Sequence, residues 1–129
     1  MVFYHDSRNV LVLEDDPGIR FVLGATIEHL GFVPYSSESR EEFIGMYRSI
    51  PYFAIILDNQ VPYDKNGPTR KDIGITLAPQ LLRKEPRLKV ALHTGDDMKQ
   101  RVPEFEKIGL VYLPKPASID SIAKFLIRD

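Results

Sequence analysis

The sequence predicts an α/β fold in which five strand–helix units build a mainly parallel sheet with helices on both faces. Two observations favour this class. Short apolar runs of strand length alternate with longer segments whose apolar residues recur at helical spacing, and prolines, glycines and capping residues fall between them. The length of 129 residues suits one core, so we expect a single domain over residues 1–129.

The first half of the chain supplies three strands and two helices. The apolar runs Val10–Leu13 and Phe53–Leu57 are typical of strands buried on both faces of a parallel sheet. Asp16 is a favourable N-cap, and Pro17 occupies the preferred first position of a helix. The predicted elements are a strand over 10–13, a helix over 17–30, a strand over 32–35, a helix that opens with a capping box at Ser39 and Glu42 and ends before Pro51, and a strand over 53–57.

The second half opens with an irregular segment and then resumes the alternation. Residues 63–73 contain Pro, Gly, Asn and several basic side chains, and they predict an inserted loop without regular structure. The elements predicted after this loop are a helix from near Thr76 with Pro79 in its first turn, a strand over 88–93, a short helix over 99–108 weakened by Pro103, a strand over 110–113, and a last helix capped by Ser118.

Composition and charge exclude several classes of protein. A net charge of −1 argues against a protein that binds nucleic acid directly and against a polybasic membrane-surface protein. The absence of cysteine excludes disulfide scaffolds and thiolate metal sites. Because no stretch resembles a signal peptide or approaches the length of a membrane span, we expect a cytoplasmic protein without a membrane partner.

Charged and polar residues follow the predicted strands at their carboxyl ends. They are Glu14 and Asp15 after the first strand, Asp58 after the third, Thr94 after the fourth and Lys115 after the fifth. In an open α/β sheet these ends share one edge, where ligands bind. Clustered carboxylates favour a hard cation such as Mg²⁺, and a metal beside a nucleophilic aspartate suits phosphoryl transfer to that aspartate. The pattern therefore predicts that Asp58 accepts a phosphoryl group whose oxygens Lys115 and Thr94 contact.

The ordered set of motifs resembles the receiver domains of two-component response regulators over nearly the whole chain. The motifs are the run from Val10 to Pro17 with Arg20, the run Ile55–Asp58 followed by Val61-Pro62, Thr94, and the Lys115-Pro116 pair. The resemblance implies a flavodoxin-like (βα)5 doubly wound fold with a five-stranded parallel sheet of order 2-1-3-4-5. It also implies a phosphoprotein of phosphorelay signalling that carries an aspartyl phosphate, and a signalling phosphoacceptor instead of an enzyme.

The resemblance assigns metal-site roles residue by residue. Asp58 matches the family's phosphoacceptor, which is also a metal ligand, and Asp15 matches the direct ligand of Mg²⁺ or Mn²⁺. Glu14 matches the second acid of the pair, which often binds the metal through water. The backbone carbonyl of Gln60 matches the third protein ligand.

The resemblance also assigns switch and rate-tuning roles. Thr94 and Lys115 match the pair that senses the phosphoryl group, and Tyr112 matches the aromatic residue whose rotamer follows activation. Gln60 and Asp96 occupy positions that tune the lifetime of the aspartyl phosphate in the family.

Partners follow from the same resemblance. A sensor histidine kinase or a phosphotransfer protein would donate the phosphoryl group, and a downstream protein, or a second copy in a homodimer, would bind the face of the fourth helix, fifth strand and fifth helix. The chain departs from the family pattern at 63–73, so that Gly74 fills the role of a glycine that usually lies nearer the phosphoacceptor. This insertion is expected to cover the site or to alter which kinase docks. Ala117 stands where a large apolar residue is usual.

Other interpretations differ in what they require of the sequence. A flavin-binding domain needs a phosphate-cradling loop after the first strand, where this chain has acids. A phosphatase with an aspartyl intermediate typically carries an aspartate two positions after its nucleophile, where this chain has Gln60. A receiver-like interaction module that no longer depends on phosphorylation stays open. His5, His29 and His93 show no metal-ligand spacing and are interpreted as structural.

Overall fold

The computed structural model describes residues 7–127, so His5 lies outside the described residues. The main sheet contains β1 (Asn9–Leu13), β2 (Val33–Ser37), β3 (Ala54–Leu57), β6 (Lys89–Thr94) and β7 (Leu110–Pro114). The helices are α1 (Pro17–His29), α2 (Arg40–Ser49), α3 (Ile73–Lys84), α4 (Val102–Ile108) and α5 (Ile119–Ile127). Two further strands, β4 (Val61–Pro62) and β5 (Thr69–Arg70), form a small separate sheet.

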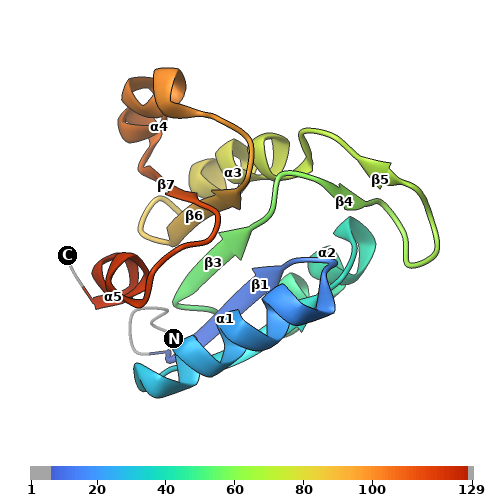
Figure 1. Ribbon diagram of the computed structural model, residues 1–129, viewed down its shortest axis with the longest axis horizontal. Coiled ribbons are helices and arrows are strands. Elements are labelled where there is room, and N and C mark those ends of the chain that lie inside the picture. Colours follow the sequence, from blue (N-terminus) through green and yellow to red (C-terminus); the bar gives the residue numbers. More distant parts are fainter. Residues whose placement is uncertain (1–6, 128–129) are drawn as a thin grey trace.

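The five strands of the main sheet are all parallel and lie in the order β2-β1-β3-β6-β7 (Figure 1). Because β4 and β5 stand apart, this order is the predicted 2-1-3-4-5 of a flavodoxin-like sheet, and the predicted fold class is confirmed. The switch in strand order falls between β1 and β3, so the carboxyl ends of these two strands border the crevice where α/β proteins bind ligands.

Successive residues of the central strands bury their side chains in two separate cores. Leu11, Ile55 and Leu57 face a core completed by α2, α3 and α4. Val12 and Ile56 face a second core completed by α1 and α5. This alternation is the two-residue period of a strand, and it explains why the central strands are continuous apolar runs.

Local capping fixes the predicted starts of three helices. Oδ1 of Asp16 accepts the N–H of Ile19 at 3.0 Å, and the hydroxyl of Ser39 accepts the N–H of Glu42 at 3.2 Å. The carboxylate of Glu42 accepts the N–H of Glu38 at 2.7 Å, so the expected capping box reaches back one residue further than predicted. The hydroxyl of Ser118 accepts the N–H of Ser121 at 3.1 Å, as a cap of α5.

Helix α3 begins three residues before the predicted start, so Pro79 lies in mid-helix and the prediction of a first-turn proline was wrong. The cause is a cap supplied from outside the helix. Asn59 accepts the N–H of Ile73 through its carbonyl at 2.8 Å and the N–H of Ile75 through Oδ1 at 3.0 Å. These bonds satisfy two of the N–H groups that a helix start leaves free, and a partner so distant along the chain gives no local signal.

The segment over 63–73 is more regular than predicted, because it contains β5, which pairs with the preceding β4 as a short antiparallel hairpin with Val61 opposite Arg70. The hairpin projects from the molecule beyond the end of β3 (Figure 1). The carbonyl of Tyr63 accepts the N–H of Glu41 at 2.8 Å, which fastens the hairpin to the start of α2. The guanidinium carbon atoms of Arg40 and Arg70 lie 5.8 and 4.8 Å, respectively, from the centre of the Tyr63 ring.

Helix α4 is short, as the proline at position 103 predicts. A 3₁₀ turn over Lys99–Arg101 precedes it, and Pro103 then falls in its first turn, where the missing N–H has no helical partner to lose. Over residues 7–127, no helix combines the length and apolar character needed to cross a membrane.

Candidate functional site

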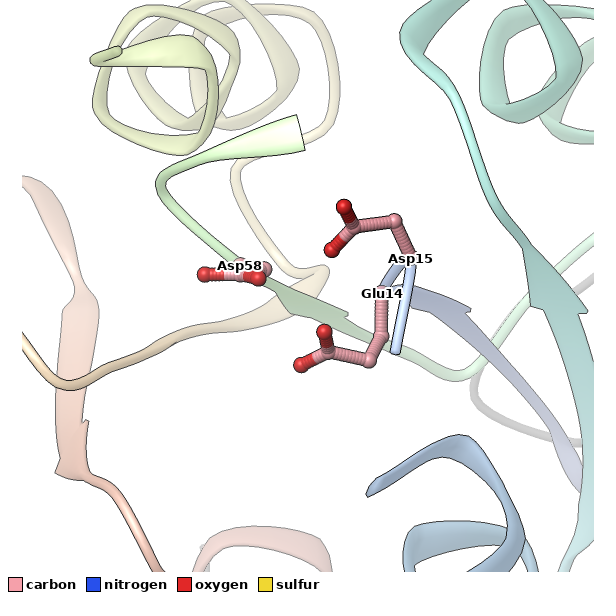
Figure 2. A group of neighbouring side chains, drawn as sticks. All are labelled: Glu14, Asp15 and Asp58. Carbon is pink, nitrogen blue, oxygen red and sulfur yellow. The ribbon is translucent and has the colours of Figure 1, made fainter. Parts of the chain in front are cut away.

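Three carboxylates lie together at the carboxyl ends of β1 and β3, as Figure 2 shows. Glu14 and Asp15 directly follow β1, and Asp58 directly follows β3. Oxygens of the three carboxylates lie within 4.8 Å of one another. Since β1 and β3 pair in parallel with Leu13 opposite Leu57, the two strands end side by side and bring the acids into contact range.

The ammonium group of Lys115 bridges two of these carboxylates. Its Nζ lies 2.8 Å from Oε1 of Glu14 and 3.1 Å from Oδ2 of Asp58. The backbone N–H of Lys115 donates to the carbonyl of Thr94 at 2.9 Å, which holds this residue at the same edge of the sheet. Both carboxylates are almost fully buried, so the ion pairs are shielded from bulk water and are stronger than pairs on the surface.

Burial and mutual repulsion shift the pKa values of the acidic pair upward. Burial is the largest cause for Glu14, and the nearby Asp58 charge adds to it while Lys115 opposes it. Burial also raises the pKa of Asp15, with a further contribution from Glu14. Burial by itself would lower the pKa of Lys115, but its contacts with Glu14 and Asp58 outweigh this effect and the pKa is raised. Folding therefore disfavours the ionised forms of Glu14 and Asp15 relative to the same carboxyl groups in water.

Arg20 holds the backbone of the acidic segment in place. Its Nη1 donates to the carbonyl oxygens of Glu14 and Asp15, each at 3.0 Å, and its Nη2 pairs with Glu38 at 3.2 Å. The N–H of Asp16 donates to Oε2 of Glu14 at 3.1 Å. Arg20 of α1 thus fixes the backbone that carries the two acids, and the Asp16 N–H holds the Glu14 carboxylate.

A polar network links the residues after β3 to those after β6. The side-chain amide of Gln60 donates to both carboxylate oxygens of Asp96, at 2.8 and 3.0 Å, and Asn59 donates to Asp96 at 3.0 Å. These bonds, from Asn59 first and Gln60 second, hold the pKa of Asp96 below its usual range. The N–H of Gln60 donates to Oδ1 of Asp58 at 3.3 Å, so the network reaches the candidate acceptor.

Thr94 and Tyr112 lie in positions that connect the site to the segment between β6 and α4. The hydroxyl of Thr94, which is buried, accepts the N–H of Asp96 at 3.0 Å. The hydroxyl of Tyr112 donates to the carbonyl of Asp96 at 2.9 Å and accepts the N–H of Met98 at 3.3 Å. Tyr112 therefore points inward and is bonded to the same short segment that Thr94 contacts.

Gly74 permits helix α3 to pack directly against the strand end that carries Asp58. A Cβ atom at position 74 would lie 2.5 Å from the carbonyl oxygen of Asp58 and 2.7 Å from Cδ1 of Leu92. Real Cβ atoms essentially never approach other atoms so closely. A glycine is therefore required at position 74, because the backbone of α3 approaches the backbone at Asp58 closely.

The donor set fits a hard divalent cation. Three carboxylates faced by one ammonium leave an excess of about two negative charges when all are ionised, and the oxygens are close enough to share one ion. Mg²⁺ prefers such oxygen ligands and keeps several waters. Glu14, Asp15 and Asp58 are the residues that would hold it.

The candidate residues from the sequence fall into two groups in space. In the first group, Lys115 contacts Glu14 and Asp58, and an oxygen of Asp15 lies within 4.8 Å of oxygens of both acids. The remaining candidates Thr94, Asp96, Gln60 and Tyr112 form the bonded network beside them. The role of the Gln60 carbonyl as a metal ligand stays a prediction. Asn59 was missed as a site residue, because its role depends on partners in α3 and after β6.

Comparisons with known proteins give one sequence relative and many structural ones. No family model matches the sequence. The chain is 27% identical over 133 residues to the peroxide stress-activated histidine kinase mak3 of Schizosaccharomyces pombe, in an alignment that covers 95% of this chain. The chain spans only 5% of the length of that relative.

Solved structures of response-regulator receivers share the fold. A response regulator from Burkholderia pseudomallei, solved with a phosphorylated aspartic acid, a calcium ion and citrate, matches 95% of this chain and 68% of its own with a TM-score of 0.74 and 22% identity. The match to the HemR receiver domain of Leptospira biflexa covers 93% of this chain and 91% of that domain, with a TM-score of 0.72 and 23% identity. The match to the chemotaxis protein CheY4 of Vibrio cholerae covers 95% of this chain and 98% of CheY4, with a TM-score of 0.71 and 18% identity. The chain has the fold of a response-regulator receiver domain, and the resemblance seen in the sequence is confirmed at the level of fold.

Proposed function

We propose that this chain is a receiver domain that accepts a phosphoryl group on Asp58 in a reaction that depends on Mg²⁺ or Mn²⁺. The observation that carries the proposal is a buried aspartate that contacts a lysine ammonium and lies within 4.8 Å of an acidic pair, at the switch point of a receiver fold. A phosphorylated aspartic acid and a calcium ion are described for the Burkholderia pseudomallei response regulator, which supports this assignment.

The chemistry is a transfer between two nucleophiles. A carboxylate oxygen of Asp58 forms a bond to phosphorus while the bond from phosphorus to the donor's imidazole nitrogen breaks, and the imidazole keeps the electron pair. The metal would supply charge neutralisation for the phosphoryl oxygens when bound. Lys115, already 3.1 Å from Asp58, would pair with a phosphoryl oxygen after transfer, and Thr94 would donate its hydroxyl to another.

The same contacts provide a switch. The hydroxyl of Thr94 accepts from the Asp96 N–H before transfer, and a phosphoryl oxygen offers it a new acceptor. Because Tyr112 is bonded to Asp96 and Met98, movement of Thr94 would be transmitted to the segment before α4 and to the Tyr112 rotamer. A contact that exists in only one state is what biases an equilibrium between inactive and active forms.

The proposed partners are a sensor histidine kinase or phosphotransfer protein as donor and a downstream protein as receiver of the signal. The face of α4, β7 and α5 exposes Ile108, Val111 and Ile119, which suits a protein partner or a second copy of the chain. A dimer is described for the beryllofluoride-activated NtrC4 receiver domain, with a TM-score of 0.73 to this chain. The proposal includes a cytoplasmic site of action and a signalling role without turnover of other substrates, carried by one domain over residues 1–129.

Beryllofluoride binding tests the proposal without a kinase, because this ion mimics a phosphoryl group on an aspartate. In ¹H–¹⁵N NMR spectra with Mg²⁺, we expect saturable shifts at Thr94, Lys115 and the segment between β6 and α4. Asp58→Asn should abolish these shifts, whereas Asp120→Asn, a change of the same type at an exposed position of α5, should keep them. Equal shifts in the Asp58→Asn protein, or none in the unmodified protein with Mg²⁺, would contradict the proposal.

A receiver-like interaction module that does not depend on phosphorylation is the second candidate. It is favoured by the ordered hairpin over 61–70, which presents Tyr63 between two arginines at the edge of the site. The two candidates differ in the effect of Asp58→Asn on partner binding. Phosphorylation-dependent binding would be lost in that variant, and hairpin-driven binding would persist.

A further inference from the structure

A pocket of about 460 Å³ lies between α1 and the segment that joins β7 to α5. Its wall consists mainly of hydrocarbon side chains, among them Ile19, Leu23, Ala117 and Ile122. Pockets that bind small organic molecules have volumes of roughly 300–1,000 Å³ and combine an apolar lining with a few polar groups. Both the size and the composition of this pocket fall in that class.

His93 contributes an imidazole to the pocket from the sheet side. Ala91 faces the core beneath α1 and α5, and His93, two residues further along β6, lies on the same face of the strand. The residue is only 3% exposed, yet neither ring nitrogen has a hydrogen-bond partner among residues 7–127. Buried polar atoms are nearly always bonded, so two unused ring positions beside a pocket are unusual. Both nitrogens are closed to solvent, so a ligand in the pocket would reach one of them once the ring turns toward it.

The environment of His93 defines the chemistry that it recognises. Burial, together with the nearby Lys115 charge, lowers the pKa of His93 to about 4. The ring is therefore neutral at physiological pH, with one nitrogen as a donor and the other as an acceptor. A ligand hydroxyl can serve either nitrogen.

Charge at the pocket favours a neutral ligand. Asp16 and Lys115 contribute one side chain of each sign to the lining, and the rest of the wall is mostly apolar. A charged ligand would lose hydration inside this wall without a dedicated counter-charge, because Lys115 is already paired with Glu14 and Asp58. An uncharged ligand avoids this cost.

We propose that this pocket beside α1 and α5 binds a small, uncharged, mainly apolar molecule whose single hydroxyl group hydrogen-bonds to His93. The occupant is of the phenol or alcohol class, with its ring or alkyl body against Ile19, Leu23 and Ile122. This binding is separate from phosphoryl transfer, so its test uses the unmodified protein without metal or phosphodonor.

The test is an NMR titration with phenol and with toluene, which have the same size and differ in the hydroxyl group. We expect saturable shifts of the His93 ring signals by phenol, with a dissociation constant below about 10 mM, as expected for a ligand of so few atoms. His93→Leu should reduce the preference for phenol over toluene at least about fivefold, the value of one hydrogen bond. His29→Gln, at an exposed histidine of α1, should leave the preference unchanged.

A second variant tests the pocket itself. Ala117→Phe should fill part of the cavity and weaken the binding of both phenol and toluene about tenfold or more. Toluene should still bind to the His93→Leu protein, in which the cavity is not filled. The proposal is overturned if phenol causes no saturable shift at His93, if the preference for phenol survives in His93→Leu, or if the ring nitrogens bond only to a water molecule that neither probe displaces. If Ala117→Phe does not fold, the phenol and toluene comparison in His93→Leu still decides the matter.

Discussion

Two glycine-to-alanine substitutions in helices should have opposite effects on stability, because only one of the glycines touches the site. Gly74 is the second residue of α3 and lies against the carbonyl of Asp58. Gly45 lies in α2, is exposed, and has no atom within 4 Å of the position that a Cβ would take. The same methyl group is therefore added once into a backbone contact and once into open space.

The expected magnitudes follow from these distances. A Cβ at Gly74 would meet the Asp58 oxygen at 2.5 Å and Leu92 at 2.7 Å, so either α3 or the end of β3 must move. Overpacking of this kind costs roughly 1–3 kcal/mol, and the improved helix propensity of alanine offsets less than about 1 kcal/mol. We expect Gly74→Ala to lower the free energy of unfolding by roughly 1–2 kcal/mol. Gly45→Ala should raise it by roughly 0.5–1 kcal/mol.

Urea denaturation followed by circular dichroism measures both changes, and beryllofluoride binding measures the displacement of Asp58. Gly74→Ala should also weaken beryllofluoride binding under conditions where the variant is fully folded, whereas Gly45→Ala should not. A Gly74→Ala protein as stable as the Gly45→Ala protein, with unchanged beryllofluoride binding, would refute the reasoning that this glycine positions the acceptor.

The remaining predictions concern charge and capping at the same edge. Lys115→Met should lower the free energy of unfolding at pH 7 by roughly 1–3 kcal/mol, because it leaves the buried Glu14 and Asp58 carboxylates without their cation. This loss of stability should shrink in acid, where the carboxylates are protonated. An equal loss at pH 4 would contradict the prediction. Asp15→Asn should stabilise the metal-free protein at pH 7. The raised pKa of Asp15 means that folding disfavours its ionised form, which costs stability. This cost is absent at low pH, grows as the pH rises from the usual pKa to the raised pKa, and is fully present above it. Mg²⁺ at ten times its dissociation constant should raise the free energy of unfolding by about 1.4 kcal/mol, and Asp15→Asn should remove this effect in thermal melts. Asn59→Ala should cost roughly 1–3 kcal/mol through loss of the α3 cap, whereas Asn66→Ala in the exposed hairpin should cost little.

Most of the fold was predictable because its signals are local. The apolar runs that became β1 and β3 needed no knowledge of their neighbours, and Asp16 caps α1 through a residue three positions away. The start of α3 was missed because its cap, Asn59, precedes the helix by fourteen residues and becomes adjacent only after folding. The hairpin was missed because β4 and β5 contain two residues each, too few to show a period.

The site was predictable in its membership but not in its bonds. Parallel strands end at one edge, so the acids after β1 and β3 and the lysine after β7 could be grouped from sequence. That Lys115 contacts both Glu14 and Asp58 depends on side-chain geometry that no spacing encodes. The unusual state of His93 was not visible either, since an isolated histidine in a strand gives no sign of whether its ring finds a partner.

The central claim is that Asp58 accepts a phosphoryl group. Intact-mass spectrometry after incubation with acetyl phosphate and Mg²⁺ measures this most directly. We expect the mass to increase by one phosphoryl group, with the increase lost in Asp58→Asn, lost when the metal is chelated, and kept in Asp120→Asn. An unchanged mass with acetyl phosphate and Mg²⁺, or an equal increase in the Asp58→Asn protein, would contradict the account.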